Sequence, residues 1–165
     1  MKILGFLLVV VTGMSIGWNT KQSQSKRIRS LEWFERFLEC AAQRIRFSAL
    51  PIAELLKDLS FMEEFSQFSL LQAASNSEDF RASWQCELEC FAKEFSLSVR
   101  EKELFSDFMN GFGKTDIVGE VHHCEQYHLL VHQCIEDVRI QVKQKGNLYL
   151  TLGFCCGGLI GLLFL

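Results

Sequence analysis

Two long uncharged runs, one at each end of the chain, constrain its fold more than any other feature. Residues 3–18 contain no charged side chain, and neither do residues 148–165. As α-helices these runs are about 24 and 27 Å long, close to the roughly 30 Å hydrocarbon core of a bilayer. The sequence therefore predicts an N-terminal transmembrane helix in residues 1–20, a C-terminal one in residues 148–165, and a polar domain in residues 21–147.

Basic residues flank both hydrophobic runs on their inner sides, and no acidic residue lies among them. They are Lys21, Lys26, Arg27 and Arg29 after the first run, and Arg139, Lys143 and Lys145 before the second. Only Lys2 lies on the outer side, so the positive-inside rule places the central domain in the cytoplasm.

A cleaved signal peptide is the competing interpretation, with Gly13-Met14-Ser15 as its processing site. The basic cluster directly after the run opposes translocation, and seven scattered cysteines make a poor disulfide framework. We expect two retained anchors, although retention or cleavage of the first run stays open.

Glycines recur at four-residue spacing inside both runs. Gly153, Gly157 and Gly161 mark the second run, and Gly13 with Gly17 repeats the spacing in the first. Such a face lets another helix backbone approach closely, so these glycines are candidate packing sites. The alternative is that glycine is simply common in membrane helices.

The central segment is strongly acidic. Residues 30–138 carry 9 basic side chains against all 20 acids of the chain. This charge repels phosphate backbones, so we expect no nucleic-acid binding and a basic polar partner.

The central segment also has the pattern of an all-α bundle, because one proline and eleven glycines in the chain leave few turn signals for a β-sandwich. Apolar residues at three- and four-residue steps predict helices over about 31–48, 51–59, 61–71, 80–95, 98–112 and 116–145. Ser98 and Glu101 form a capping-box pattern, and Gly111 and Gly113 end the helix that it opens. A pause at Gly146-Asn147 is expected before the last run.

The last of these helices has the most regular apolar seam in the chain. It consists of Ile117, Val121, Cys124, His128, Val131, Ile135, Val138 and Val142. Alternating steps of four and three are typical of a heptad. Packing within the same bundle is favoured, and intermolecular pairing, hence homo-oligomerisation, stays open.

Histidines and cysteines crowd residues 122–134, which suggests a metal or redox site. Cys124, His128 and His132 follow one another at four-residue steps, so the outer two are about 12 Å apart along a helix and at most two can share one ion. A second pair would have to come from elsewhere, and Cys86 and Cys90 have the only similar spacing. We therefore predict no metal ligands and no cofactor.

Nothing in the sequence indicates catalysis. Gly113-Lys114-Thr115 resembles the end of a phosphate-binding loop, but Phe108 stands where that motif needs glycine. The acid pairs Glu63-Glu64 and Glu136-Asp137 fit solvated helix faces, since adjacent residues on a helix do not face each other. We predict no catalytic residue.

Two stretches of the carboxyl half have distinctive motifs. They are Leu97–Asp116, which includes Glu103-Leu104, Phe108 and Phe112-Gly113-Lys114-Thr115-Asp116, and then Lys145-Gly146-Asn147-Leu148-Tyr149 with Leu152-Gly153 and Gly157-Gly158. Most specifically in these motifs, and over its full length, the chain resembles the stage III sporulation protein AB family. Pro51 with Ile52–Leu59, after Ile45-Arg46-Phe47, also fits. Phe112, Thr115 and Glu120 depart from the expected leucine, serine and glutamine.

The resemblance implies a non-enzymatic scaffold in the transport complex between mother cell and forespore. It implies a cytoplasmic antiparallel helical bundle similar to type II secretion F-type platform domains. The implied partners are the complex's cytoplasmic ATPase (SpoIIIAA), the other membrane components and membrane lipid. The implied location is the cell membrane or outer forespore membrane, with the central domain facing the mother-cell cytoplasm. The alternative function is a membrane-tethered metal or redox sensor built on His122 to Cys134.

Overall fold

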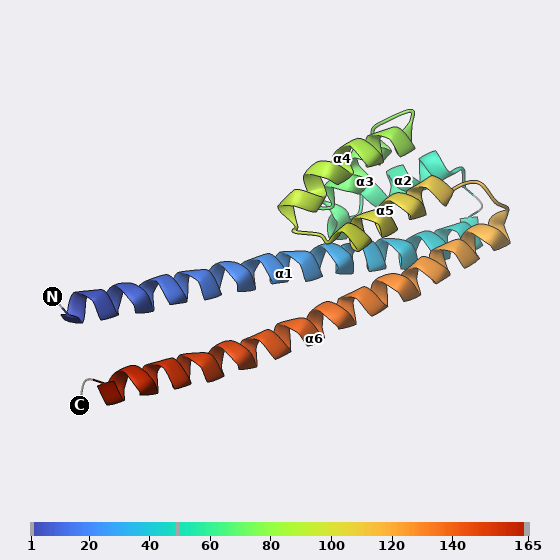
Figure 1. Ribbon diagram of the computed structural model, residues 1–165. Helices are drawn as coiled ribbons and strands as arrows, with labels where there is room; N and C mark the ends of the chain where they lie inside the picture. The colour runs from blue at the N-terminus through green and yellow to red at the C-terminus, as the bar shows by residue number, and fades with distance from the viewer. Residues whose placement is uncertain (1, 49, 164–165) are drawn as a thin grey trace.

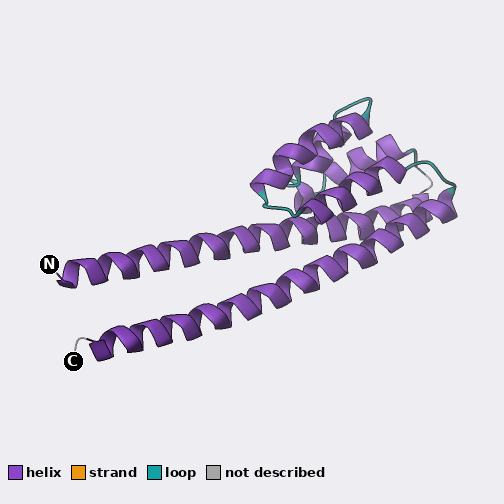
Figure 2. Ribbon diagram, in the orientation of Figure 1, coloured by secondary structure: helices purple, strands orange, loops and turns teal. Residues whose placement is uncertain are grey.

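The computed structural model describes the backbone of residues 2–48 and 50–163, and the side chains of residues 22–48 and 50–144. Every regular element in this part of the chain is helical, so the predicted all-α class is confirmed there (Figure 2). The elements are α1 (Lys2–Ser48), α2 (Ile52–Ser60), the short 3-10 helix η1 (Glu63–Phe65), α3 (Ser69–Ser75), α4 (Phe80–Glu94), α5 (Val99–Gly111) and α6 (Ile117–Leu163).

The two long helices form an antiparallel pair that carries a small bundle at one end. Figure 1 shows α1 and α6 side by side, with α2 to α5 stacked on the pair where α1 ends and α6 begins. Both chain termini lie at the opposite end (Figure 1). The two long helices therefore form a stem. The part of the stem that carries no other helix separates the bundle from the chain ends.

The core is centred on an aromatic cluster whose rings come from several elements of the bundle and from α1. Phe37 of α1 is fully buried, and six aromatic rings surround it with centroids 6.0 to 6.5 Å away. These rings belong to Phe34, Phe65, Phe68, Trp84, Phe108 and Phe112. Because the rings come from α1, η1, α4, α5 and the turns beside them, the cluster fixes the bundle to the stem.

The apolar seam of α6 packs within the same chain. Val121, Cys124, Val131, Ile135 and Val138 are buried, and α6 lies against α1 along the described stem. The favoured prediction of intramolecular packing is therefore confirmed for these positions. Ile117 at the start of the seam is half exposed, because α6 begins there beyond the last turn of α1.

The predicted pause at Gly146-Asn147 is wrong. α1 runs unbroken from the first hydrophobic run through the basic flank to Ser48, and α6 continues across Gly146-Asn147 to Leu163. Residues 19–48 contain no proline or glycine, so nothing local stops α1. The pause was predicted from one glycine and one asparagine, whose combined helix penalty of about 1.5 kcal/mol is small beside that of a proline.

The predicted helix over 61–71 is also wrong. The chain is extended at Met62, forms η1, turns again at Phe68 and only then enters α3. This path buries Phe65 and Phe68 and leaves Phe61 with 87% of its surface exposed. Similarly, Pro51 lies just before α2 as its N-cap, rather than inside its first turn.

Among the residues with described side chains, no helix combines the length and apolar character needed to cross a bilayer. The runs 3–18 and 148–165, which carry the two predicted anchors, lie outside those residues. The three-part division of the chain stays a prediction.

Candidate functional site

The charged junction between the stem and the bundle is the most constrained polar site in the described part of the chain. Arg27 of α1 donates from Nε and Nη2 to the Glu101 carboxylate of α5 at 2.9 to 3.1 Å. Only 17% of the arginine side chain and 3% of the glutamate side chain are exposed. This bidentate pair joins residues 74 positions apart in the sequence.

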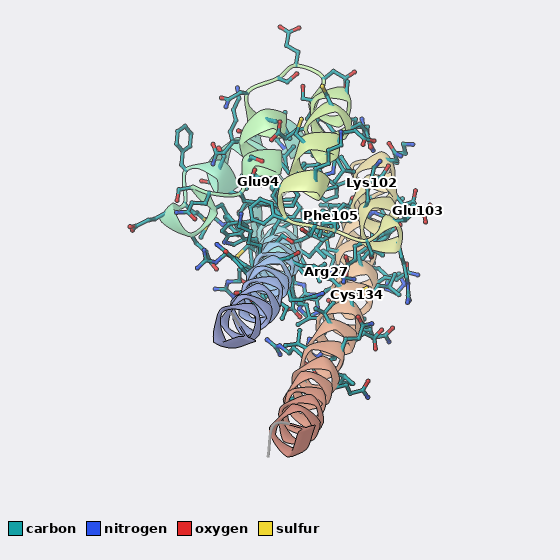
Figure 3. All side chains as sticks on the ribbon, turned by 60° about the vertical axis from the view of Figure 1, so that its left-hand side comes forward. Arg27, Glu94, Lys102, Glu103, Phe105 and Cys134 are labelled. Carbon is teal, nitrogen blue, oxygen red and sulfur yellow. The ribbon has the colours of Figure 1, made fainter. Side chains whose placement is uncertain are left out.

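The sequence builds one half of this pair locally. Ser98 precedes α5, and its hydroxyl accepts a hydrogen bond from the Glu101 backbone amide, while the Glu101 carboxylate accepts one from the Ser98 amide. The predicted capping box is therefore confirmed. The cap fixes Glu101 at the third position of α5. In this position its carboxylate also accepts the hydrogen bonds from Arg27. Figure 3 shows Arg27 on α1 with Phe105 of α5 above it.

The other basic residues that were predicted to set topology have different surroundings. Arg139 of α6 contacts Glu32 of α1 at 3.0 Å and Glu136 at 2.8 Å, and about half of each side chain is exposed. Arg29 lies over the Trp33 ring at 6.0 Å. Lys26 and Lys143 are exposed. Lys21 and Lys145 lie outside the residues with described side chains, as do the packing candidates Gly13, Gly17, Gly153, Gly157 and Gly161.

The histidines and cysteines of residues 122–134 do not gather at one point, although His128 and His132 both approach Glu35 of α1. His123 stacks on Phe108 and its Nε2 lies 3.1 Å from the Phe108 carbonyl oxygen, whereas His132 Nδ1 lies 2.8 Å from Glu35 Oε1. His128 Nε2 is 3.8 Å from the same oxygen. Burial raises the pKa of the Cys124 thiol to about 12, which disfavours its thiolate.

Within the described residues, no three His, Cys, Asp or Glu side chains are arranged to hold a metal ion. The cluster thus supplies no convergent ligand set there.

The buried carboxylate of Glu120 holds the turn before α6 in place. This role was not predicted from the sequence. Glu120 Oε1 accepts hydrogen bonds from the Lys114 amide, the Thr115 amide and the Thr115 hydroxyl at 2.8 to 2.9 Å. Burial alone raises the pKa of the Glu120 carboxyl, but the backbone hydrogen bonds from residues 113–115 and the Thr115 hydroxyl lower it overall. Gly113 has a φ of +79°, which glycine adopts without strain.

Gly113-Lys114-Thr115 therefore binds a carboxylate of the same chain, that of Glu120. The amides that a phosphate-binding loop would offer to a ligand are already engaged. The glycines at 111 and 113 marked the turn in the sequence, but nothing there linked Glu120 to it, since Glu120 follows the turn by several residues.

The two acid pairs lie on different faces. Glu63 and Glu64 are exposed on η1, and Glu136 and Asp137 are exposed on α6. Glu64 bonds Arg36 at 2.8 Å, and Glu136 bonds Arg139 at 2.8 Å. These are solvated surface positions, as the sequence predicted.

The family model described as stage III sporulation protein AB matches residues 2–165 of the chain. No curated protein and no solved structure matches the chain.

Proposed function

The chain belongs to the stage III sporulation protein AB family, and from this premise we propose that it is a non-enzymatic membrane platform of the sporulation transport complex. Membership implies a role in stage III of sporulation. In our proposal, two anchors hold the acidic bundle in the mother-cell cytoplasm, where it docks the complex's ATPase. The bundle then has the same role as the F-type platform domains of type II secretion.

The observation that carries this proposal is the placement of both chain termini at one end of the stem and of the bundle at the other (Figure 1). Two anchors of one chain must enter the same bilayer from the same side, and an antiparallel helix pair satisfies that requirement. Arg27, where α5 is bonded to α1, follows residue 18 by nine positions, or roughly 14 Å along the helix, so the bundle begins just beyond the lipid headgroups.

The charge and side-chain arrangement also support a scaffold. Most of the described acids are exposed, several of them in ion pairs such as Arg46–Glu125 and Lys102–Glu89, rather than gathered around a nucleophile or base. A platform for a basic partner needs a charged surface, not a reactive centre. The sensor alternative is less favoured, because the cluster at residues 122–134 does not converge in the described structure.

Topology gives the first test of this proposal. We expect a Glu78→Cys variant, in a Cys86→Ser, Cys90→Ser background, to resist a membrane-impermeant maleimide in intact sporulating cells. After permeabilisation the exposed residue 78 should be labelled, which a mass shift of the purified chain measures. The background without the Glu78 substitution controls for the other cysteines. Labelling in intact cells would place the bundle outside the cytoplasm and overturn the proposal.

Binding of the ATPase gives the second test. The full chain in detergent should capture the purified ATPase at low salt and release it as ionic strength rises, because the proposed contact is electrostatic. Reversing Glu63 and Glu64 to lysine should weaken binding about tenfold or more, since each lost surface pair contributes up to about 1 kcal/mol.

A matched control comes from the second acid pair. Glu136→Lys with Asp137→Lys makes the same charge change on α6, and in both pairs one acid already bonds an arginine. Equal weakening by both double variants would indicate general charge attraction rather than a contact made by Glu63 and Glu64. Absence of capture at low salt would contradict ATPase docking itself.

A further inference from the structure

Two cysteines of α4 are exposed, which is unusual for this residue type. Cys40, Cys124 and Cys134 are buried, whereas Cys86 and Cys90 are exposed. Free cysteine is among the most frequently buried residues in folded proteins. An exposed pair in one helix is therefore not explained by packing in the core.

The neighbours of this pair fix the direction in which it points. Trp84, Leu88 and Phe91 are buried and mark the inner face of α4. On one flank Gln85 donates to the Ser106 carbonyl oxygen of α5, and on the other Glu87 accepts from the Ser69 hydroxyl of α3. Cys86 and Cys90 consequently occupy the outer crest of α4.

The spacing of the pair suits chelation. Residues four apart on a helix have Cβ atoms about 5–6 Å apart, so their sulfur atoms can converge to the roughly 4 Å that separates two ligands of one zinc ion. Zinc in a structural site takes four ligands. Within the described residues no third His, Cys, Asp or Glu completes the set, so one chain supplies half a site.

We propose that Cys86 and Cys90 bind a zinc ion jointly with the same two cysteines of a second copy of this chain. Four thiols release four protons to solvent and coordinate one Zn²⁺ as thiolates, which gives a centre of net charge −2. Lys93 is exposed one turn beyond Cys90, and the two copies of this lysine offset that charge.

The surroundings of the crest allow such a contact. Ala82, one turn before Cys86, is exposed and small, so two α4 helices can approach closely. α4 contacts α3 and α5 and lies on the side of the bundle away from the stem (Figure 1). A second copy whose stem points the same way can therefore reach the crest without displacing α1 or α6.

The test uses the full chain in detergent under a thiol reductant, with Cys155→Ser and Cys156→Ser so that the terminal run contributes no thiol. We expect about half an equivalent of zinc per chain and a dimer that dissociates when the zinc is chelated. Co²⁺ in place of zinc should give the visible absorption of a tetrahedral tetrathiolate centre. Cys86→Ser and Cys90→Ser should each abolish the dimer and the absorption.

Cys124→Ala, at a buried cysteine of α6, is the matched control and should leave zinc content and dimer unchanged. Circular dichroism of each variant confirms that its helices are intact. One zinc per monomeric chain, no retained zinc, or a dimer that survives Cys86→Ser would each overturn the proposal. None of these outcomes bears on ATPase docking, which is measured separately.

Discussion

Replacing Phe37 by alanine is expected to destabilise the bundle by about 3–5 kcal/mol, the usual cost of removing a buried phenylalanine ring. Phe37 is fully buried and touches rings from several elements that meet the stem there. The cavity that the substitution leaves has rigid aromatic walls, so little relaxation can fill it. Urea unfolding of the full chain in detergent, followed by tryptophan fluorescence to which the buried Trp84 contributes, measures the loss.

Phe47→Ala is the matched control, because Phe47 also belongs to α1 but is 83% exposed. Its replacement should change the free energy of unfolding by less than about 0.5 kcal/mol. If both variants lose equal stability, the aromatic cluster is not the core that holds the bundle to the stem.

The second large effect is expected at the junction ion pair. Arg27→Ala should cost about 2–4 kcal/mol, since it leaves the carboxylate of Glu101 buried without its cation. Arg139→Ala removes a pair whose two side chains are about half exposed, and should cost less than about 1 kcal/mol. Thermal or urea unfolding of the full chain in detergent compares the two variants.

Arg27→Lys separates two roles of this residue. Lysine keeps the positive charge that the topology prediction needs, but it cannot donate through a bidentate fork. We expect normal membrane orientation together with a measurable loss of stability. An Arg27→Lys protein as stable as the parent would show that charge alone, without the fork, holds α5 to α1.

Local patterns in the sequence were sufficient for much of the bundle. The capping box at Ser98 and Glu101, the apolar stripe of α4 and the seam of α6 are all read from residues within a few positions of each other. These three predictions agree with the structure because helix periodicity and capping depend on short-range contacts. The buried sides of α4 and α6 followed from the same periodicity.

Long-range pairing was not accessible in this way. Arg27 looked only like a topology signal, because its partner lies 74 residues away and no spacing links them. The helix predicted over 61–71 would place Phe61 on the same apolar stripe as Phe65, but the chain turns at Met62 and leaves Phe61 in solvent. In both cases tertiary packing, rather than local propensity, decided the outcome.

The continuity of α1 has a mechanical consequence. The part of α1 from residue 19 to Ser48 is roughly 45 Å long and contains no proline or glycine that could act as a hinge. A tilt of about 10° at one end of this part therefore displaces its other end by roughly 8 Å. Since contacts at Arg27 and Phe37 fix the bundle to this part of α1, a force on the bundle would reach its residue-19 end as a rigid-body rotation rather than being absorbed as local bending.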